Sequence, residues 1–367
     1  MIPRYYKRRL VGYFAIASLI VGVPSCWYFA ALICDLQAIR QIQYLGGTTI
    51  VDTVPVLPEY ARGLLGGNLD IRTSRLRDVT LSGLNVDDKS LAPLEDLSRV
   101  PELFLDSTAV TGQTLDRFRA KSSLRVLSLQ DSAVNDLGLS KIAGLYNLEY
   151  LNLTGTSVSA PALHSISQLR SLKSLYLETT HVDDDAIHVF TSLPLLECLW
   201  LPHTNITSNG LRNLGKISTL RMLGLSNTSV DDAGLKYISS LTRLECLDVS
   251  ETSIQGEQLS QLRSLASLRR LHLSGLLLDD KSAEQIASIL SVEWLYLNDT
   301  KISDRGAREL NGRYQILDLS NTLITDASLI HFASIPTLNV LRVKGTGITR
   351  EGIREFEVLR PDVTVSY

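Results

Sequence analysis

Residues that cross-link a fold, perform catalysis or charge a surface strongly are scarce in this chain. Its 367 residues include four cysteines and six histidines, only 6% are aromatic, and the formal net charge is −3. A net charge this close to zero gives no electrostatic footprint for nucleic-acid binding, so we expect no nucleic-acid partner. The HExxH, GxSxG, GxGxxG, P-loop and CxxC motifs are absent, and the histidines are scattered. We therefore expect a protein that is not an enzyme and uses neither a cofactor nor a metal ion.

One long stretch without charge lies near the N-terminus, from Leu10 to Cys34. As a helix rising ~1.5 Å per residue it would cross the ~30 Å hydrocarbon layer of a membrane. Basic residues precede it at positions 4, 7, 8 and 9, which favours a cytoplasmic N-terminus. We therefore expect a single-pass protein of the cytoplasmic membrane. Residues 1–9 would form a cytoplasmic tail, residues 10–34 a transmembrane helix or signal anchor, and the remainder would face the periplasm or exterior.

Two alternatives to an uncleaved anchor stay open. A cleavable signal peptide has a shorter apolar core and a small-residue cleavage site. The segment from Val23 to Cys26 loosely resembles a bacterial lipoprotein cleavage box, with Cys26 as the lipidated residue. Apolar residues continue beyond it through Trp27 and Ile33, which favours the uncleaved anchor.

The rest of the chain repeats with a period of 24 residues. Leu124, Leu127 and Leu129 recur at the same spacing in the following rows, and each row reads approximately LxxLxLxxTxITDxGLxxLxxL. Twelve such units begin at residues 76, 100, 124, 148, 172, 196, 220, 244, 268, 292, 314 and 338. The unit that begins at 292 is two residues shorter than the others, because Asn311 and Gly312 lead early into the next unit.

Each unit changes its apolar spacing halfway. The first half alternates with period two, which predicts a short strand with inward leucines. The second half has spacing three, as in Leu235, Ile238 and Leu241, which suits one face of a short helix. Between them, the twelfth position is a helix-capping residue type in every unit except the one with Gln255. The agreement of strand, cap and helix predicts an α/β leucine-rich-repeat solenoid, a horseshoe with a parallel inner sheet of about thirteen strands and short outer helices.

These assignments divide the chain into five parts. The cytoplasmic tail (1–9) and transmembrane helix (10–34) precede a stalk and N-terminal cap (35–75), in which Thr48–Val51 has strand character. Twelve repeats follow (76–361), and a capping strand (362–367) closes the array. Cys198 and Cys246 lie two repeats apart, about 9–10 Å at the strand spacing, which is too far for a disulfide.

Two polar columns of the repeat have structural interpretations. The ninth position is mostly threonine, and we expect its hydroxyl to link neighbouring turns. Paired acidic residues in the turns, such as Asp183-Asp184 and Asp279-Asp280, could line one edge of the solenoid and bind calcium. Helix capping explains them more simply. From Asp88 to Asp280 the acid of the thirteenth position recurs in alternate units, which keeps like charges ~10 Å apart, about one Debye length.

Rows such as LEYLNLTGTSVSAPALHSI and LRMLGLSNTSVDDAGLKYI resemble leucine-rich repeats with a T-x-[VI]-[ST]-D-x-G-L turn, a subtype abundant in planctomycete bacteria. The basic start, the single membrane segment and the juxtamembrane AIRQIQYLGG (Ala38–Gly47) are similar too. The resemblance covers nearly the whole chain. It implies a bacterial cell-envelope protein with a protein-binding role and no defined ligand.

Aromatic residues gather on the expected concave wall, at the strand positions beside the inward leucines. Large aromatics on such a wall are typical binding anchors, whereas the structural alternative is that they stack along the strands. We define the first aromatic cluster as Tyr150, Tyr176 and Trp200, with His203 beside it, and the second aromatic cluster as Arg270, His272, Trp294 and Tyr296.

The sequence therefore predicts a membrane-anchored, non-catalytic protein-binding module whose partner is an unidentified protein or peptide. Two alternatives stay open: a structural, self-associating envelope protein, and a receptor for a glycan or a peptide. The identity of the ligand does not follow from these patterns.

Overall fold

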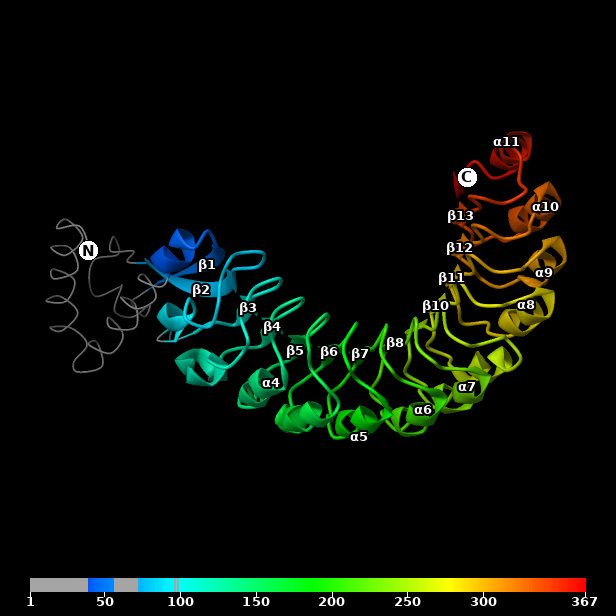
Figure 1. Cartoon of the computed structure of the whole chain (residues 1–367). Helices are drawn as coiled ribbons and strands as arrows, with labels where there is room; N and C mark the ends of the chain where they lie inside the picture. Colours follow the sequence, from blue (N-terminus) through cyan, green and yellow to red (C-terminus); the bar gives the residue numbers. More distant parts are fainter. Residues whose placement is uncertain (1–38, 56–71, 96, 98) are drawn as a thin grey trace, which may run out of the picture. The chain divides into compact units, whose positions relative to one another are not determined.

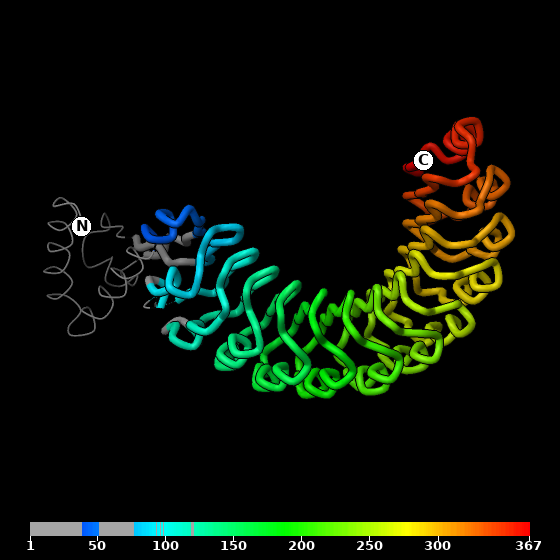
Figure 2. Tube along the Cα trace, in the orientation of Figure 1, coloured from blue at the N-terminus to red at the C-terminus, as the bar shows by residue number. Residues whose placement is uncertain are grey.

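The computed structural model describes residues 39–55, 72–95, 97 and 99–367 (Figures 1 and 2). The apolar run at 10–34 lies outside the described residues. Among the helices that are described, none combines the length and the apolar character needed to cross a membrane. The chain forms two compact units, Met1–Leu148 and Glu149–Tyr367.

The first unit begins with an antiparallel pair of strands. Residues 39–44 are helical, and the turn that follows contains Gly46, whose φ of 86° suits a glycine. Strand β1 (Thr48–Pro55) follows and pairs antiparallel with β2 (Arg72–Thr80). The strand of the first repeat thus begins at Arg72, before the first residue of the unit at 76, and it pairs with β1 along its whole length. Ile42 is fully buried, so this segment covers apolar residues of the first repeat.

The remainder of the first unit consists of parallel strands and short helices. Strand β2 pairs in parallel with β3 (Glu102–Phe104), and β3 with β4 (Val126–Ser128). The connecting elements are η1 (Ala92–Leu94), η2 (Leu115–Arg117), η3 (Arg119–Ser122) and α4 (Asp136–Ile142).

The second unit continues the same pattern through ten parallel strands. They are β5 (Tyr150–Asn152), β6 (Ser174–Tyr176), β7 (Cys198–Trp200), β8 (Met222–Gly224), β9 (Cys246–Asp248), β10 (Arg270–His272), β11 (Trp294–Tyr296), β12 (Ile316–Asp318), β13 (Val340–Arg342) and β14 (Thr364–Ser366). Each strand is in register with the next, as in the pair Leu271↔Leu295. The inward leucines of these strands, such as Leu199 and Leu223, are fully buried.

Helices lie on the opposite side of the second unit from its strands (Figure 1). They are η4 (Pro161–Gln168), η5 (Asp184–Ala186), α5 (Ile187–Phe190), α6 (Ser208–Leu214), α7 (Asp232–Ile238), η6 (Leu259–Ser264), α8 (Asp280–Ala287), α9 (Asp304–Glu309), η7 (Asp326–Ser328), α10 (Leu329–Ala333) and α11 (Arg350–Leu359). Within this unit the strands therefore form the concave wall and the helices the convex one.

The twelfth position caps a helix in most repeats. Side chains that accept a backbone N–H there belong to Asn135, Asp183, Thr207, Asp231, Asp279, Ser303, Thr325 and Thr349. The expectation was wrong for Thr111 and Ser159, whose repeats have 3-10 helices without a side-chain cap. Pro161 is two residues after Ser159 and lacks the N–H that such a cap would bind. Gly112, with a φ of 84°, turns the backbone away from a helix directly after Thr111.

The threonines of the ninth position have a different role from the one expected. Their hydroxyls donate within their own repeat, as Thr180 Oγ1 does to the carbonyl of Leu177 at 2.6 Å. They satisfy a buried carbonyl where the chain leaves the strand. The residue before each of them has a positive φ, as Thr179 does at 53°.

The acidic residue of the thirteenth position links neighbouring repeats instead. Asp184 accepts the backbone N–H of Thr207 at 2.8 Å and its hydroxyl at 2.6 Å. Asp88, Asp280, Asp304 and Asp326 make the equivalent bonds. A Cβ on Gly210 would overlap the carboxylate of Asp184, so the glycine of the D-x-G-L turn leaves room for the acid of the preceding repeat. These carboxylates are therefore bonded within the protein.

Candidate binding face

Seven of the eight candidate residues lie on strands of the concave wall, all in the second unit. They belong to β5, β6, β7, β10 and β11. Each of these seven side chains is half-buried, so part of every one is accessible from solvent. The parallel register puts residues one repeat apart side by side, as in Tyr176↔Trp200 and Arg270↔Trp294.

The two tyrosines of the first aromatic cluster are in contact. The ring centroids of Tyr150 and Tyr176 are 5.1 Å apart, with an angle of 40° between the ring planes. The Cys198 thiol donates a weak hydrogen bond to the Tyr176 hydroxyl at 3.5 Å. Burial raises the pKa of the Tyr176 phenol, and the Cys198 contact adds to this rise. Tyr176 therefore stays neutral and is held between a ring and a thiol.

Trp200 leans toward the next strand. A Cβ built on Gly224 would come within 2.5 Å of Cδ2 of the indole, so the ring covers the backbone of that glycine. Gly224 is the register partner of Trp200 on β8. The missing side chain at residue 224 thus provides the space in which the indole lies against the sheet.

His203 is separate from the rings of the first aromatic cluster. It lies in the turn after β7, with a φ of 52° and an exposed side chain. Its backbone N–H donates to the carbonyl of Ser226 at 3.0 Å. The structure thus places His203 at the rim of the wall, whereas the three rings are on its strands.

The second aromatic cluster combines stacking with charge. The guanidinium carbon of Arg270 lies 5.2 Å from the centre of the Trp294 ring, within the range of a cation–π contact. The rings of His272 and Tyr296 stack with centroids 4.2 Å apart and an interplanar angle of 9°. Burial lowers the pKa of His272, and Arg270 also lowers it, while Asp248 opposes both effects.

The second aromatic cluster continues into two residues that the sequence interpretation did not select. Arg342 lies over Tyr296, with its guanidinium carbon 5.8 Å from the ring centre. It also pairs with Asp318 at 3.4 Å, and Asp318 is itself buried. Both occupy the same strand position as His272 and Tyr296 in the next two repeats. A comparison of this strand position in successive repeats would have identified Asp318 and Arg342, because they are neighbours of opposite charge.

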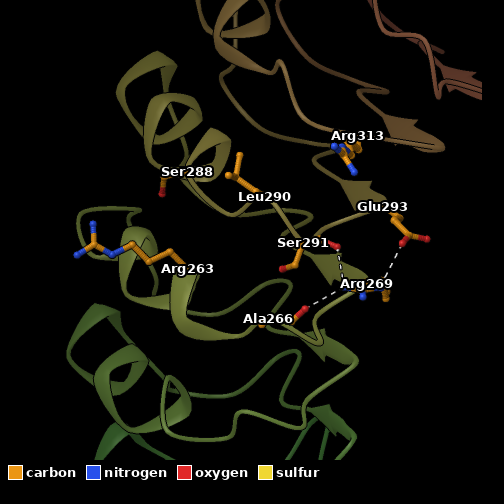
Figure 3. A pocket seen from close by; sticks show the side chains of 8 residues that line it. All are labelled: Arg263, Ala266, Arg269, Ser288, Leu290, Ser291, Glu293 and Arg313. Carbon is orange, nitrogen blue, oxygen red and sulfur yellow. Dashed lines mark hydrogen bonds and ion pairs between the residues drawn. The ribbon is translucent and has the colours of Figure 1, made fainter.

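A cavity of about 440 Å³ lies among the segments that lead into β10–β12 (Figure 3). Arg269 is one of its lining residues and is bonded within the protein. It donates to the carbonyls of Ala266 at 3.0 Å and Ser291 at 3.2 Å, and it pairs with Glu293 at 3.1 Å. The Arg263 side chain, which also lines the cavity, extends away from Arg269 in this view. The positive charges therefore do not converge on one point.

The fold and the wall define a class of protein, the solenoid built from leucine-rich units. A family model described as "Leucine-rich repeat region" matches residues 103–352, and the chain belongs to the leucine-rich repeat family. Proteins of this family typically mediate protein–protein interactions, and the fold is typically a non-catalytic scaffold. No curated protein matches the chain.

Solved structures of other proteins share the fold. An internalin from Listeria monocytogenes matches with a TM-score of 0.60 at 18% identity, over 83% of this chain and 92% of that one. A leucine-rich-repeat protein of Leptospira interrogans matches with a TM-score of 0.55 at 18% identity, over 75% and 74%. A TDR receptor matches with a TM-score of 0.53 at 17% identity, over 76% of this chain and 48% of that one. At these identities the likeness concerns the fold alone.

Proposed function

We propose that this protein binds a protein or peptide partner on the concave wall of its second unit. The observation that carries the proposal is the concentration of half-buried rings there, in a chain that is only 6% aromatic. Tyr176, Trp200 and Trp294 combine large apolar area with few rotatable bonds, which makes such residues effective anchors. The contacts that the rings make within each cluster hold them in place before a partner arrives, which lowers the entropy cost of binding.

We further propose that residues 10–34 anchor the protein in the cytoplasmic membrane, with the repeats in the periplasm or outside the cell. The uncharged run and the basic residues before it support this orientation. The resemblance to planctomycete envelope proteins supports the same location. A C-terminal fusion to a reporter that works only outside the cytoplasm should be active. An inactive fusion, together with an active cytoplasmic reporter, would reverse the proposed topology.

The binding proposal can be tested in intact cells with a photo-crosslinking amino acid placed at single positions. At Tyr176 or Trp294 we expect a defined adduct with another protein. At Ile330, an exposed residue of the convex helix α10, we expect none. Adducts that form equally well at Ile330, or only there, would contradict the proposal. Where an adduct forms at Trp294, Trp200→Ala should reduce its yield, since the anchors act on one partner.

The same experiment distinguishes the two alternative functions. An adduct with twice the mass of the chain would indicate a self-associating envelope protein. Sedimentation of the protein at increasing concentration would then show a second copy. An adduct with a polysaccharide would support a glycan receptor, since sugar rings also stack on flat aromatic surfaces such as Trp200.

A further inference from the structure

Two histidines meet on the convex side of the second unit, away from the concave wall. His164 lies on η4 and His188 on α5, at the same position of consecutive repeats. Both side chains are exposed. Their ring centroids are 4.6 Å apart with an interplanar angle of 55°, and their Nε2 atoms are 2.8 Å apart. The two Nε2 atoms are therefore within hydrogen-bond distance of each other.

This spacing suits a metal ion bound by both rings. Imidazole nitrogen binds first-row divalent metals at about 2.0–2.1 Å, so two such ligands at a right angle would be about 2.9 Å apart. A separation of 2.8 Å is therefore close to that required by the square-planar and octahedral geometries of Cu²⁺ and Ni²⁺. The tetrahedral geometry of Zn²⁺ would need a slightly wider pair.

We propose that His164 and His188 form a binding site for a divalent transition-metal ion, held by the two Nε2 atoms and completed by water. In the metal-free pair, one Nε2–H donates to the other Nε2. Binding requires both Nε2 atoms to be unprotonated. The proton on the donating Nε2 therefore moves to Nδ1 of the same ring. Between neutral rings this change of tautomer releases no net proton.

The charges around the pair have opposing effects. Asp185 lies one helical turn before His188, where a carboxylate favours a nearby cation. Arg212 occupies the position equivalent to His188 in the next repeat, and its positive charge disfavours a nearby cation. Within the described part of the chain, no group of three or more His, Cys, Asp or Glu residues could hold a metal. The site therefore uses two protein ligands, which predicts a weaker affinity than that of a structural zinc site.

Titration of the full-length protein with Ni²⁺, followed by calorimetry at about pH 7.5, tests the site. We expect one ion per chain. His164→Ala and His188→Ala should each weaken binding at least about tenfold, since even indirect supports of a metal ligand contribute 10–100-fold. His181→Ala is the matched control. His181 is exposed and lies before η5, and the ring contact and the Nε2 hydrogen bond of the pair join only His164 and His188.

Cu²⁺ gives an independent readout, because its electron paramagnetic resonance spectrum counts coordinated nitrogens. We expect two in the native protein and one in either alanine variant. Lowering the pH to about 5.5 should weaken binding, since protons compete for imidazole nitrogen. The proposal is wrong if the native protein binds no stoichiometric Ni²⁺, if both alanine variants bind it as the native protein does, or if His181→Ala causes the same loss. Circular dichroism of each variant verifies that the fold is intact.

Discussion

The two aromatic clusters occupy the same repeat positions of one wall but have different neighbours. In the first aromatic cluster the rings meet another ring, a thiol and the backbone of Gly224. In the second, Arg270 stacks on Trp294 and the His272–Tyr296 pair continues into Arg342 and Asp318. The contacts within the first aromatic cluster thus depend on shape, and those within the second depend on shape and charge together.

This difference bears on how each cluster would recognise a partner. A ring that covers a glycine offers an apolar surface whose interaction depends little on pH or salt. Exposed ion pairs and cation–π contacts are weakened by salt. A partner that uses both clusters would be held by apolar contacts at one end and selected by charge at the other.

The largest expected effect is on the first aromatic cluster, in the variant Gly224→Val. Valine favours strands, but its Cβ would overlap the indole of Trp200. We expect the free energy of unfolding to fall by about 1–3 kcal/mol, as for other overpacked sites. Urea unfolding measures the change.

A double-mutant cycle identifies the cause of that loss. In a Trp200→Ala background the overlap is absent, so Gly224→Val should cost much less than it does in the native protein. Equal costs in the two backgrounds would show that the indole does not lie over Gly224. The first aromatic cluster would then lack its defining contact.

The leucine period predicted the fold, and the column of strand residues predicted which side chains share the wall. These inferences succeed because residues one repeat apart must become neighbours in a parallel sheet. The hydrogen bonds that Thr207 donates to Asp184 were missed, although both residues belong to the recurring turn. A motif read within one repeat does not show a contact made between two, so the acids were interpreted through helix capping and charge spacing.

Ring orientation could not be predicted from the period either. Tyr176 leans toward Tyr150 while Trp200 leans toward Gly224, because each side chain fills the space that its neighbours leave. That space depends on which residue stands one repeat before and after. The anchor at 10–34 stays a prediction, since it lies outside the described residues.

An intermediate effect is expected in the second aromatic cluster from Asp318→Ala. The carboxylate of Asp318 is buried, accepts the N–H of Ser320 at 3.1 Å and its hydroxyl at 2.7 Å, and pairs with Arg342. Removal should cost about 1–2 kcal/mol of unfolding free energy, as for hydrogen bonds to a charged group. Urea unfolding again provides the measurement.

Asp248 is the matched control for Asp318. It occupies the same strand position and accepts the corresponding N–H, from Ser250, at 3.0 Å, but it is more exposed. We expect Asp248→Ala to cost about half as much as Asp318→Ala. Equal costs would mean that the pairing with Arg342 does not stabilise this end of the wall.

The smallest expected effect is a pH dependence confined to the second aromatic cluster. Burial holds the pKa of His272 below its ordinary value of 6.5. The unfolded chain therefore takes up this proton more readily than the folded one, so protonation favours unfolding. The contribution of His272 to stability is complete above pH 6.5 and is lost as the pH falls below it. Arg270 strengthens this trend and Asp248 weakens it.

Urea midpoints at about pH 7.5 and about pH 5.5 measure this dependence in the native protein and in His272→Gln. The variant should lose less stability than the native protein over that interval, because glutamine does not titrate. Tyr176→Phe, in the first aromatic cluster, should leave the loss unchanged, since the tyrosine is neutral at both pH values. A His272→Gln variant with the native pH dependence would show that the charge around His272 does not distinguish the two clusters, leaving shape as their only difference.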